Sequence, residues 1–221
     1  MSVSLRQSYA TPSNVQTGVA VTTGQLILVG FGYNAALASI TCSDNSSGGT
    51  NTYNQIGTGL YVSPHTVSGH VFYAIAKGTE TLTITCTTQG GNTISVHVIT
   101  GNNTTLASVL DTSSTMAEGA DGTTHTGNNI TTGYANDYIF SFWFTENNTD
   151  SVTENGQSFV KESEMAGDAS TFDRVVTATG TYHDAMTSSV ANSYGNFTAA
   201  FKAASGGTTA GPFPTFRPDI P

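Results

Sequence analysis

Two acidic side chains have the spacing that catalysis on a β-sheet would require. Glu162 and Glu164 stand two residues apart, so they would lie on one face of a strand. Glycoside hydrolases with a sandwich fold use such a pair, with carboxyl groups about 5 to 9 Å apart. Here no Trp or Tyr adjoins the pair to seat a sugar ring. The other acids weighed for this role stand in turn-like surroundings: Glu154, Asp168, Asp173 and Asp184. We therefore expect no glycosidase activity.

The histidines do not form a catalytic or metal-binding pattern. They are dispersed along the chain as His65, His70, His97, His125 and His183. None has the H-x-H or H-E-x-x-H spacing of a metal site, and no G-x-S-x-G elbow supplies a nucleophilic serine. We expect these histidines at the surface or in hydrogen bonds, in a protein that is not an enzyme and needs no cofactor.

One turn-rich segment has the oxygen-bearing side chains of a calcium loop. Asp44, Asn45 and Asn51 could supply ligands, together with main-chain carbonyl groups. Asp, Asn and Gly also favour ordinary turns, and a turn is the preferred interpretation. These three residues are the candidate metal site of the sequence.

The charge of the chain limits its partners. The formal net charge is −9, and the six Lys and Arg residues are scattered, so no patch could follow a phosphate backbone. We expect no nucleic-acid binding. No apolar stretch approaches the ~20 residues of a membrane span, and the first residues lack the apolar core of a signal peptide. Folding in the cytoplasm, with no membrane partner, is the resulting prediction.

The two cysteines occur in matching contexts, Ile40-Thr41-Cys42 and Ile84-Thr85-Cys86. Alternation places each Cys on the same face as its Ile, which should be the core face. Buried free thiols are the preferred interpretation, because disulfides are rare in the cytoplasm. A disulfide between them is the alternative.

The first half of the chain resembles the second. Thr22-Thr23-Gly24 leads into the apolar run 26–31, and Thr131-Thr132-Gly133 leads into the apolar run 138–144. Further on, Gly78-Thr79 and Gly180-Thr181 each precede an alternating stretch. The sequence thus predicts an all-β fold: a two-sheet, jelly-roll-type β-sandwich of two similar four-strand halves. Residues 1–205 should form this single domain.

Alternation within the strands predicts which side chains are buried. In the segment 138–144, three phenylalanines should face one side (Phe140, Phe142 and Phe144) and Ile139, Ser141 and Trp143 the other. The segment 79–87 should direct Leu82, Ile84 and Cys86 into the core. His97, in the alternating segment 94–98, should face outward.

The last sixteen residues differ in composition from the rest. Four of the six prolines lie in the segment 206–221, beside the apolar residues Phe213, Phe216 and Ile220. Proline removes main-chain donors and reduces the entropy lost on docking. The segment is predicted to be an extended arm that binds a neighbouring subunit, with Arg217 available for a carboxylate. A tail that folds back on its own domain, or stays mobile, is the alternative.

Three segments resemble a β-sandwich domain of tailed-phage structural proteins and of surface proteins of environmental bacteria. They are Thr22-Thr23-Gly24-Gln25-Leu26-Ile27-Leu28-Val29, Ile40-Thr41-Cys42-Ser43-Asp44 with Asn51-Thr52-Tyr53, and Phe72-Tyr73-Ala74-Ile75-Ala76-Lys77-Gly78-Thr79 with the strand that follows. The resemblance covers about residues 15–203. That group has no catalytic motif, so the resemblance implies a structural or surface role.

These observations predict a virion structural protein, a capsid decoration (cement) protein on the particle exterior. Its partners would be the major capsid protein or other virion proteins, and it would itself be an oligomer, with a trimer favoured. Such a particle assembles in the host cytoplasm, so no export signal is needed. A tail or receptor-binding appendage, or a carbohydrate-binding surface adhesion module, is the alternative.

Overall fold

The computed structural model describes most of the chain, with short gaps. The described residues are 3–36, 38–62, 67–87, 92–113, 116–145, 152–155, 158–165 and 169–204. The segment 206–221, with Phe213, Phe216, Arg217 and Ile220, lies outside them.

The first half of the chain forms two antiparallel sheets. The larger has the strand order β1 (Ser4–Thr11), β8 (Asn92–Thr100), β3 (Leu26–Tyr33), β6 (Val67–Ile75) and β5 (Asn54–Val62). The smaller has the order β2 (Val15–Val21), β7 (Glu80–Cys86) and β4 (Cys42–Asp44).

The second half repeats this arrangement after the short helix α1 (Leu106–Val109). Its larger sheet has the order β10 (Ala117–Thr126), β17 (Ala185–Phe201), β12 (Tyr138–Thr145), β15 (Ala169–Val175) and β14 (Val160–Met165). Two further strands pair with β17: β9 (Leu110–Ser113) and β13 (Val152–Glu154). The smaller sheet pairs β11 (Ile130–Thr131) with β16 (Thr181–Tyr182).

The order of pairing shows that the two halves are structural repeats. Leu26 of β3 pairs with Ile75 and Ile99, and Tyr138 of β12 pairs with Val175 and Phe201 in the corresponding strands. The all-β sandwich of two similar halves is confirmed. Within the described residues the first half contributes eight strands and the second half nine, rather than four each, because short strands such as β4 and β11 leave little periodicity to read.

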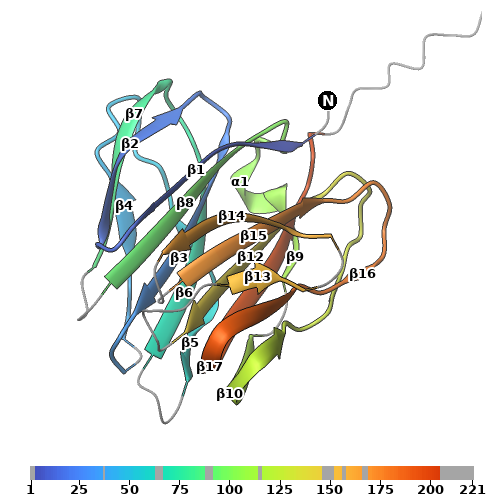
Figure 1. The fold of residues 1–221 in the computed structure, drawn as a ribbon. Coiled ribbons are helices and arrows are strands. Elements are labelled where there is room, and N and C mark those ends of the chain that lie inside the picture. The colour runs from blue at the N-terminus through green and yellow to red at the C-terminus, as the bar shows by residue number, and fades with distance from the viewer. Residues whose placement is uncertain are drawn as a thin grey trace, which may run out of the picture.

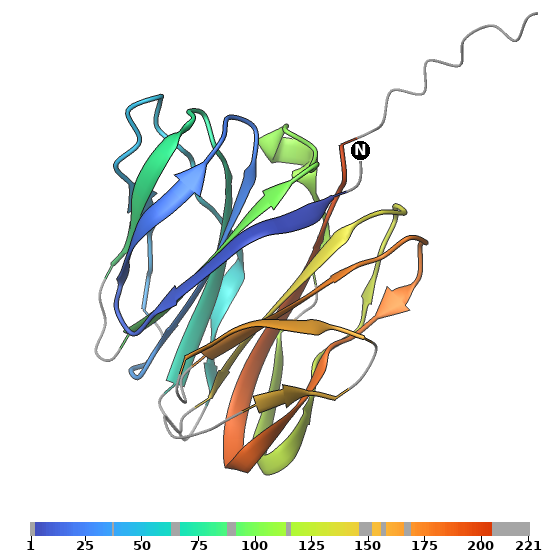
Figure 2. The same ribbon diagram turned by 45° about the horizontal axis from the view of Figure 1, so that its top comes forward.

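The sheets stack in four layers. The two larger sheets face each other, and the smaller sheets cover their outer faces (Figures 1 and 2). One core lies between the larger sheets, a second between the sheets of the first half, and a third between those of the second half. Each of the two larger sheets therefore has a core against both of its faces. Since β3 and β12 are central strands of these sheets, every residue in them is buried.

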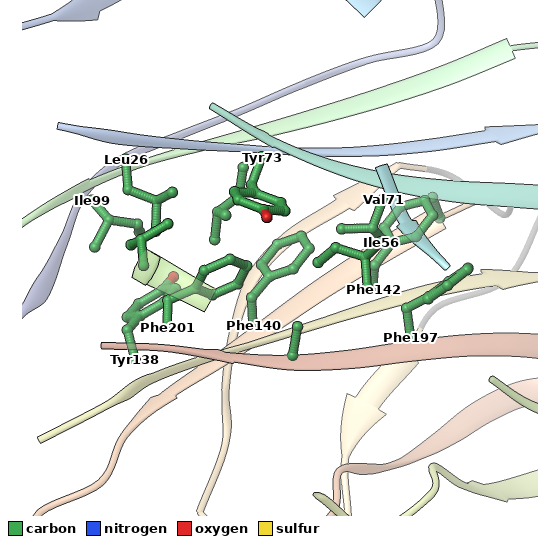
Figure 3. Packing of buried hydrophobic residues seen from close by; sticks show 14 of the residues in the cluster. Leu26, Ile56, Val71, Tyr73, Ile99, Tyr138, Phe140, Phe142, Phe197 and Phe201 are labelled. Atoms are coloured by element: carbon green, nitrogen blue, oxygen red, sulfur yellow. The ribbon is translucent and has the colours of Figure 1, made fainter. Parts of the chain in front are cut away.

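β12 supplies four aromatic rings to the central core. Phe140, Phe142 and Phe144 enter it, whereas Ile139 and Trp143 enter the core of the second half, as alternation predicted (Figure 3). Gly30 of β3 lies directly under the ring of Phe142, where a Cβ atom would collide with the ring. The two repeats are thus in close apolar contact.

The structure corrects the prediction of free thiols. Cys42 and Cys86 are directly opposite each other in the β4–β7 pair and form a disulfide, with Cα atoms 4.1 Å apart. Cys86 does face the core of the first half, as predicted. The matching sequence contexts correctly indicated one shared face, but only the pairing of β4 with β7 shows that the residues are neighbours.

Candidate functional site

The predicted acidic pair is split between two environments. A bulge between Lys161 and Ser163 interrupts the β14–β15 pairing. Glu164 accepts hydrogen bonds from the Lys161 ammonium group (2.5 Å) and from the main-chain N–H of Val152 (2.8 Å), which ties β14 to β13. Glu162 instead contacts the carboxyl group of Asp173. The carboxyl pair of the structure is therefore Glu162 and Asp173.

A buried polar network extends from this pair across the two larger sheets. His97 of β8 is fully buried, so the prediction that it faces outward was wrong. Its Nδ1 lies 3.0 Å from the Tyr138 hydroxyl, and its Nε2 lies 2.8 Å from Thr171 Oγ1. The face of β8 that a lone sandwich would expose is covered here by the second repeat, and the sequence of β8 alone does not reveal that cover.

Hydroxyl groups extend the network to the edge of the sheets. Ser163 Oγ lies 2.5 Å from Thr171 Oγ1 and 3.5 Å from Ser95 Oγ. Ser8 of β1 donates to the main-chain carbonyl of Glu162 at 3.3 Å. Because the Tyr138 hydroxyl also bonds to Asp173, the network joins five strands, namely β1, β8, β12, β14 and β15.

Burial controls the protonation of this network. Desolvation lowers the pKa of His97 to about 3, so the imidazole is neutral. Desolvation also raises the pKa of Asp173; the Tyr138 hydroxyl opposes this rise and the neighbouring Glu162 adds to it, and the pKa that results is about 7. A single proton shared by Asp173 and Glu162 removes the repulsion between them.

The geometry of the network does not suit hydrolysis of a substrate. The two carboxyl groups touch, so no sugar ring can fit between them as a glycosidase would require. Two surface pockets of the described chain have other linings, one around Gln25 and Asn102 and one around Ile40 and Gln55. We interpret the network as a set of hydrogen bonds that joins the two repeats.

The candidate calcium loop is held by its own hydrogen bonds. Asp44 Oδ2 accepts from Asn51 Nδ2 (2.8 Å) and from the Tyr53 hydroxyl (2.7 Å), and Asp44 Oδ1 accepts from the main-chain N–H of Ser46 (3.0 Å). Asn45 is directed away, and its Oδ1 accepts from the main-chain N–H of Thr83 at 2.7 Å. Asp44 and Asn51 are therefore brought together, and Asn45 is not.

Two further histidines take part in hydrogen bonds, as expected. His70 Nε2 lies 3.2 Å from the Tyr33 hydroxyl, and desolvation lowers the pKa of His70 to about 4. His125 Nε2 lies 3.1 Å from Ser188 Oγ. His183 follows β16 and is partly buried, and His65 lies outside the described residues.

A second acidic pair, which the sequence did not reveal, lies at one end of the second repeat. Asp137 precedes β12 and is fully buried, and its carboxyl group faces that of Asp111 on β9. Neither carboxyl oxygen of Asp137 has a hydrogen-bond donor among the residues that the structure describes. Desolvation, reinforced by Asp111, raises the pKa of Asp137 to about 7, whereas the charge of Lys202 lowers it. The sequence around Asp111 and Asp137 does not indicate that the two side chains are in contact.

Comparison of the chain with protein-family models, with curated proteins and with solved structures gives no match. In the part of the chain that the structure describes, no helix is long and apolar enough to span a membrane. No three side chains of His, Cys, Asp or Glu converge within the same residues in a way that could hold a metal ion.

Proposed function

We propose that this protein is a non-enzymatic structural protein of a bacteriophage virion. In this role it decorates the capsid exterior, where it binds the major capsid protein or other virion proteins. The proposal draws on the resemblance of the sequence to phage sandwich domains and on the contacts that hold residues 203–204, which precede the segment 206–221, on the sandwich.

The last described residues are fixed to the sandwich. Ala203 forms a β-bridge with Asn102, and the main-chain N–H of Ala204 donates to the carbonyl of Gly101 at 2.6 Å. Ser4, at the start of β1, pairs with Thr100 immediately before this point. The N-terminal strand and the attachment point of the segment 206–221 therefore lie at one end of the molecule (Figure 1). This attachment is the observation that carries the proposal.

A rigid body with a segment held at one end suits assembly on a particle. Two repeats that share an aromatic core, and a disulfide in the outer sheet, resist local opening. Phe213, Phe216 and Ile220 then offer apolar contacts to a neighbouring subunit, and each contact raises the effective concentration of the next.

The alternative of a sugar-binding module receives less support. Such modules present several exposed aromatic rings for stacking on sugars. Among the described residues Tyr134 is the only aromatic side chain that is largely exposed, at 54%. Lys202 covers part of its ring, with Nζ 4.6 Å from the ring centroid.

Labelling of phage particles tests the proposed location. Antibodies against the sandwich should label intact particles over the capsid in electron micrographs. Labelling confined to the tail would replace the decoration role with the appendage role. Labelling of the bacterial surface, with none on particles, would refute the virion assignment.

The role of the segment 206–221 is tested by removing it. The full chain should be a trimer in light scattering, whereas a chain that ends at Ala204 should be a monomer. Both should melt within about 4 °C of each other, the shift that 1 kcal/mol produces in a protein of this size. The matched control is the full chain with Phe213→Ala and Phe216→Ala, which should also be monomeric. A sharply lower melting temperature for the short chain would instead show that the segment packs on its own domain.

A further inference from the structure

The two repeats place a polar side chain at the same position, but its hydrogen-bond partners differ between them. Gln25 immediately precedes β3, and Asp137 immediately precedes β12. The main-chain carbonyl of Gln25 accepts from Ala76 N–H (2.9 Å), and that of Asp137 accepts from Val176 N–H (3.0 Å). The two residues are therefore equivalent in the fold.

In the first repeat the guanidinium group of Arg6 donates a hydrogen bond to the side chain of Gln25. Gln25 Oε1 accepts from the Arg6 guanidinium group at 2.9 Å and from the main-chain N–H of Thr22 at 2.7 Å. In the second repeat the equivalent oxygens belong to Asp137, are fully buried, and have no donor. The side chain that faces them is the carboxyl of Asp111, itself held by a hydrogen bond of 2.6 Å from Gly133 N–H.

Lys202 lies near Asp137 but does not take the role that Arg6 has beside Gln25. Lys202 is the cationic side chain that acts on Asp137, but its Nζ lies over the Tyr134 ring. It forms no hydrogen bond with Asp137, whose oxygens remain without a donor. Two carboxylates and one ammonium group leave a net negative charge at the site, and two facing carboxylates need a positive charge or a proton between them.

We propose that Asp111 and Asp137 bind a divalent cation of the calcium type. Carboxylate oxygens are the preferred ligands of this hard cation, and water and main-chain carbonyl groups commonly complete its coordination. The bound ion joins β9 to the turn before β12, and so takes the place that Arg6 has in the first repeat. It also lies beside Lys202, two residues before the last described residue.

Calcium titration of the full chain tests the proposal. Isothermal titration at pH 7.5 should give a Kd of about 10⁻⁴ to 10⁻³ M, the range of extracellular calcium modules. Asp137→Asn and Asp111→Asn should each weaken binding at least about tenfold, because each removes one of two charged ligands. Tb³⁺ provides a second readout, since light absorbed by Tyr134 and Tyr138 should sensitise its emission in the wild type and not in Asp137→Asn.

Folding of the variants does not limit the test. The amide of Asp137→Asn can donate to Asp111, so this variant should melt at or above the temperature of the calcium-free wild type. Glu118→Gln, which removes an exposed charge on β10, is the matched control and should bind calcium as the wild type does.

Two outcomes would overturn the proposal. Absence of binding to the wild type at about 10 mM calcium, far above the expected Kd, would mean that a proton alone joins the two carboxyls. Equal binding to the wild type and Asp137→Asn, with loss in Asp44→Asn, would place the ion in the loop around Asp44 instead.

Discussion

Replacement of Asp173 by Asn tests the protonation of the network between the repeats. The amide keeps both hydrogen bonds of the protonated acid: its oxygen accepts from Tyr138, and its NH₂ group donates to Glu162. The variant therefore mimics the protonated form of Asp173 at every pH, and the side chain at this position no longer ionises.

The expected effect depends on pH. The folded-state pKa of Asp173 is about 7, above the ordinary value of 3.8 for this side chain, so the folded state holds a proton that the unfolded chain releases. The resulting stability is complete below pH ~4 and is lost as the pH rises through ~7. The difference between the folded and unfolded pKa corresponds to about 4 kcal/mol as an upper limit, and sharing of the proton with Glu162 lowers this contribution, so we expect about 2 to 4 kcal/mol.

Urea unfolding at pH 5, 6, 7 and 8 provides the measurement. Asp173→Asn should exceed the wild type by about 1 to 2 kcal/mol at pH 5, where the unfolded acid has already ionised, and by about 2 to 4 kcal/mol at pH 8. Asp137 and Asp184 also titrate over this range, but they do so in both proteins and cancel in the difference. A difference that is the same at pH 5 and pH 8 would refute the raised pKa, and Glu118→Gln should show no such trend.

Three further changes test the packing. Phe142→Ala should cost about 3 to 5 kcal/mol, because the ring is fully buried between the repeats; an unchanged melting temperature would contradict the assignment of β12, and Val160→Ala on the exposed side of β14 is the control. Gly30→Ala should cost about 1 to 3 kcal/mol in the wild type and much less in Phe142→Ala, where the colliding ring is absent; additive costs would exclude the contact. Replacement of both Cys42 and Cys86 by Ala should cost about 2 to 4 kcal/mol, and thiol titration of the denatured wild type without reductant should detect no free group; two reactive groups would refute the disulfide.

Local sequence determined the elements and their faces. Alternation in the segment 138–144 placed Phe142 and Trp143 on opposite faces, and each is now seen in a different core. The Thr-Gly motifs before the apolar runs indicated the repeat, although the connection to the central strand is longer in the second half, where Gly133 stands five residues before Tyr138 and Gly24 only two before Leu26. Period-two patterning is a property of the strand alone, so no knowledge of its partners was required.

Tertiary structure decided which faces are covered and which distant residues meet. His97 alternates with apolar residues and would be exposed in a single sandwich, but the second repeat buries it. Asp173 contacts Glu162 at the bulge in the β14–β15 pairing, and Asp137 faces Asp111 where β12 and β9 both pair with β17. Cys42 and Cys86 could be placed on one face by periodicity, but their covalent bond required the register of β4 on β7. Register and sheet stacking arise from contacts between strands, so they cannot be read from the pattern of any one strand.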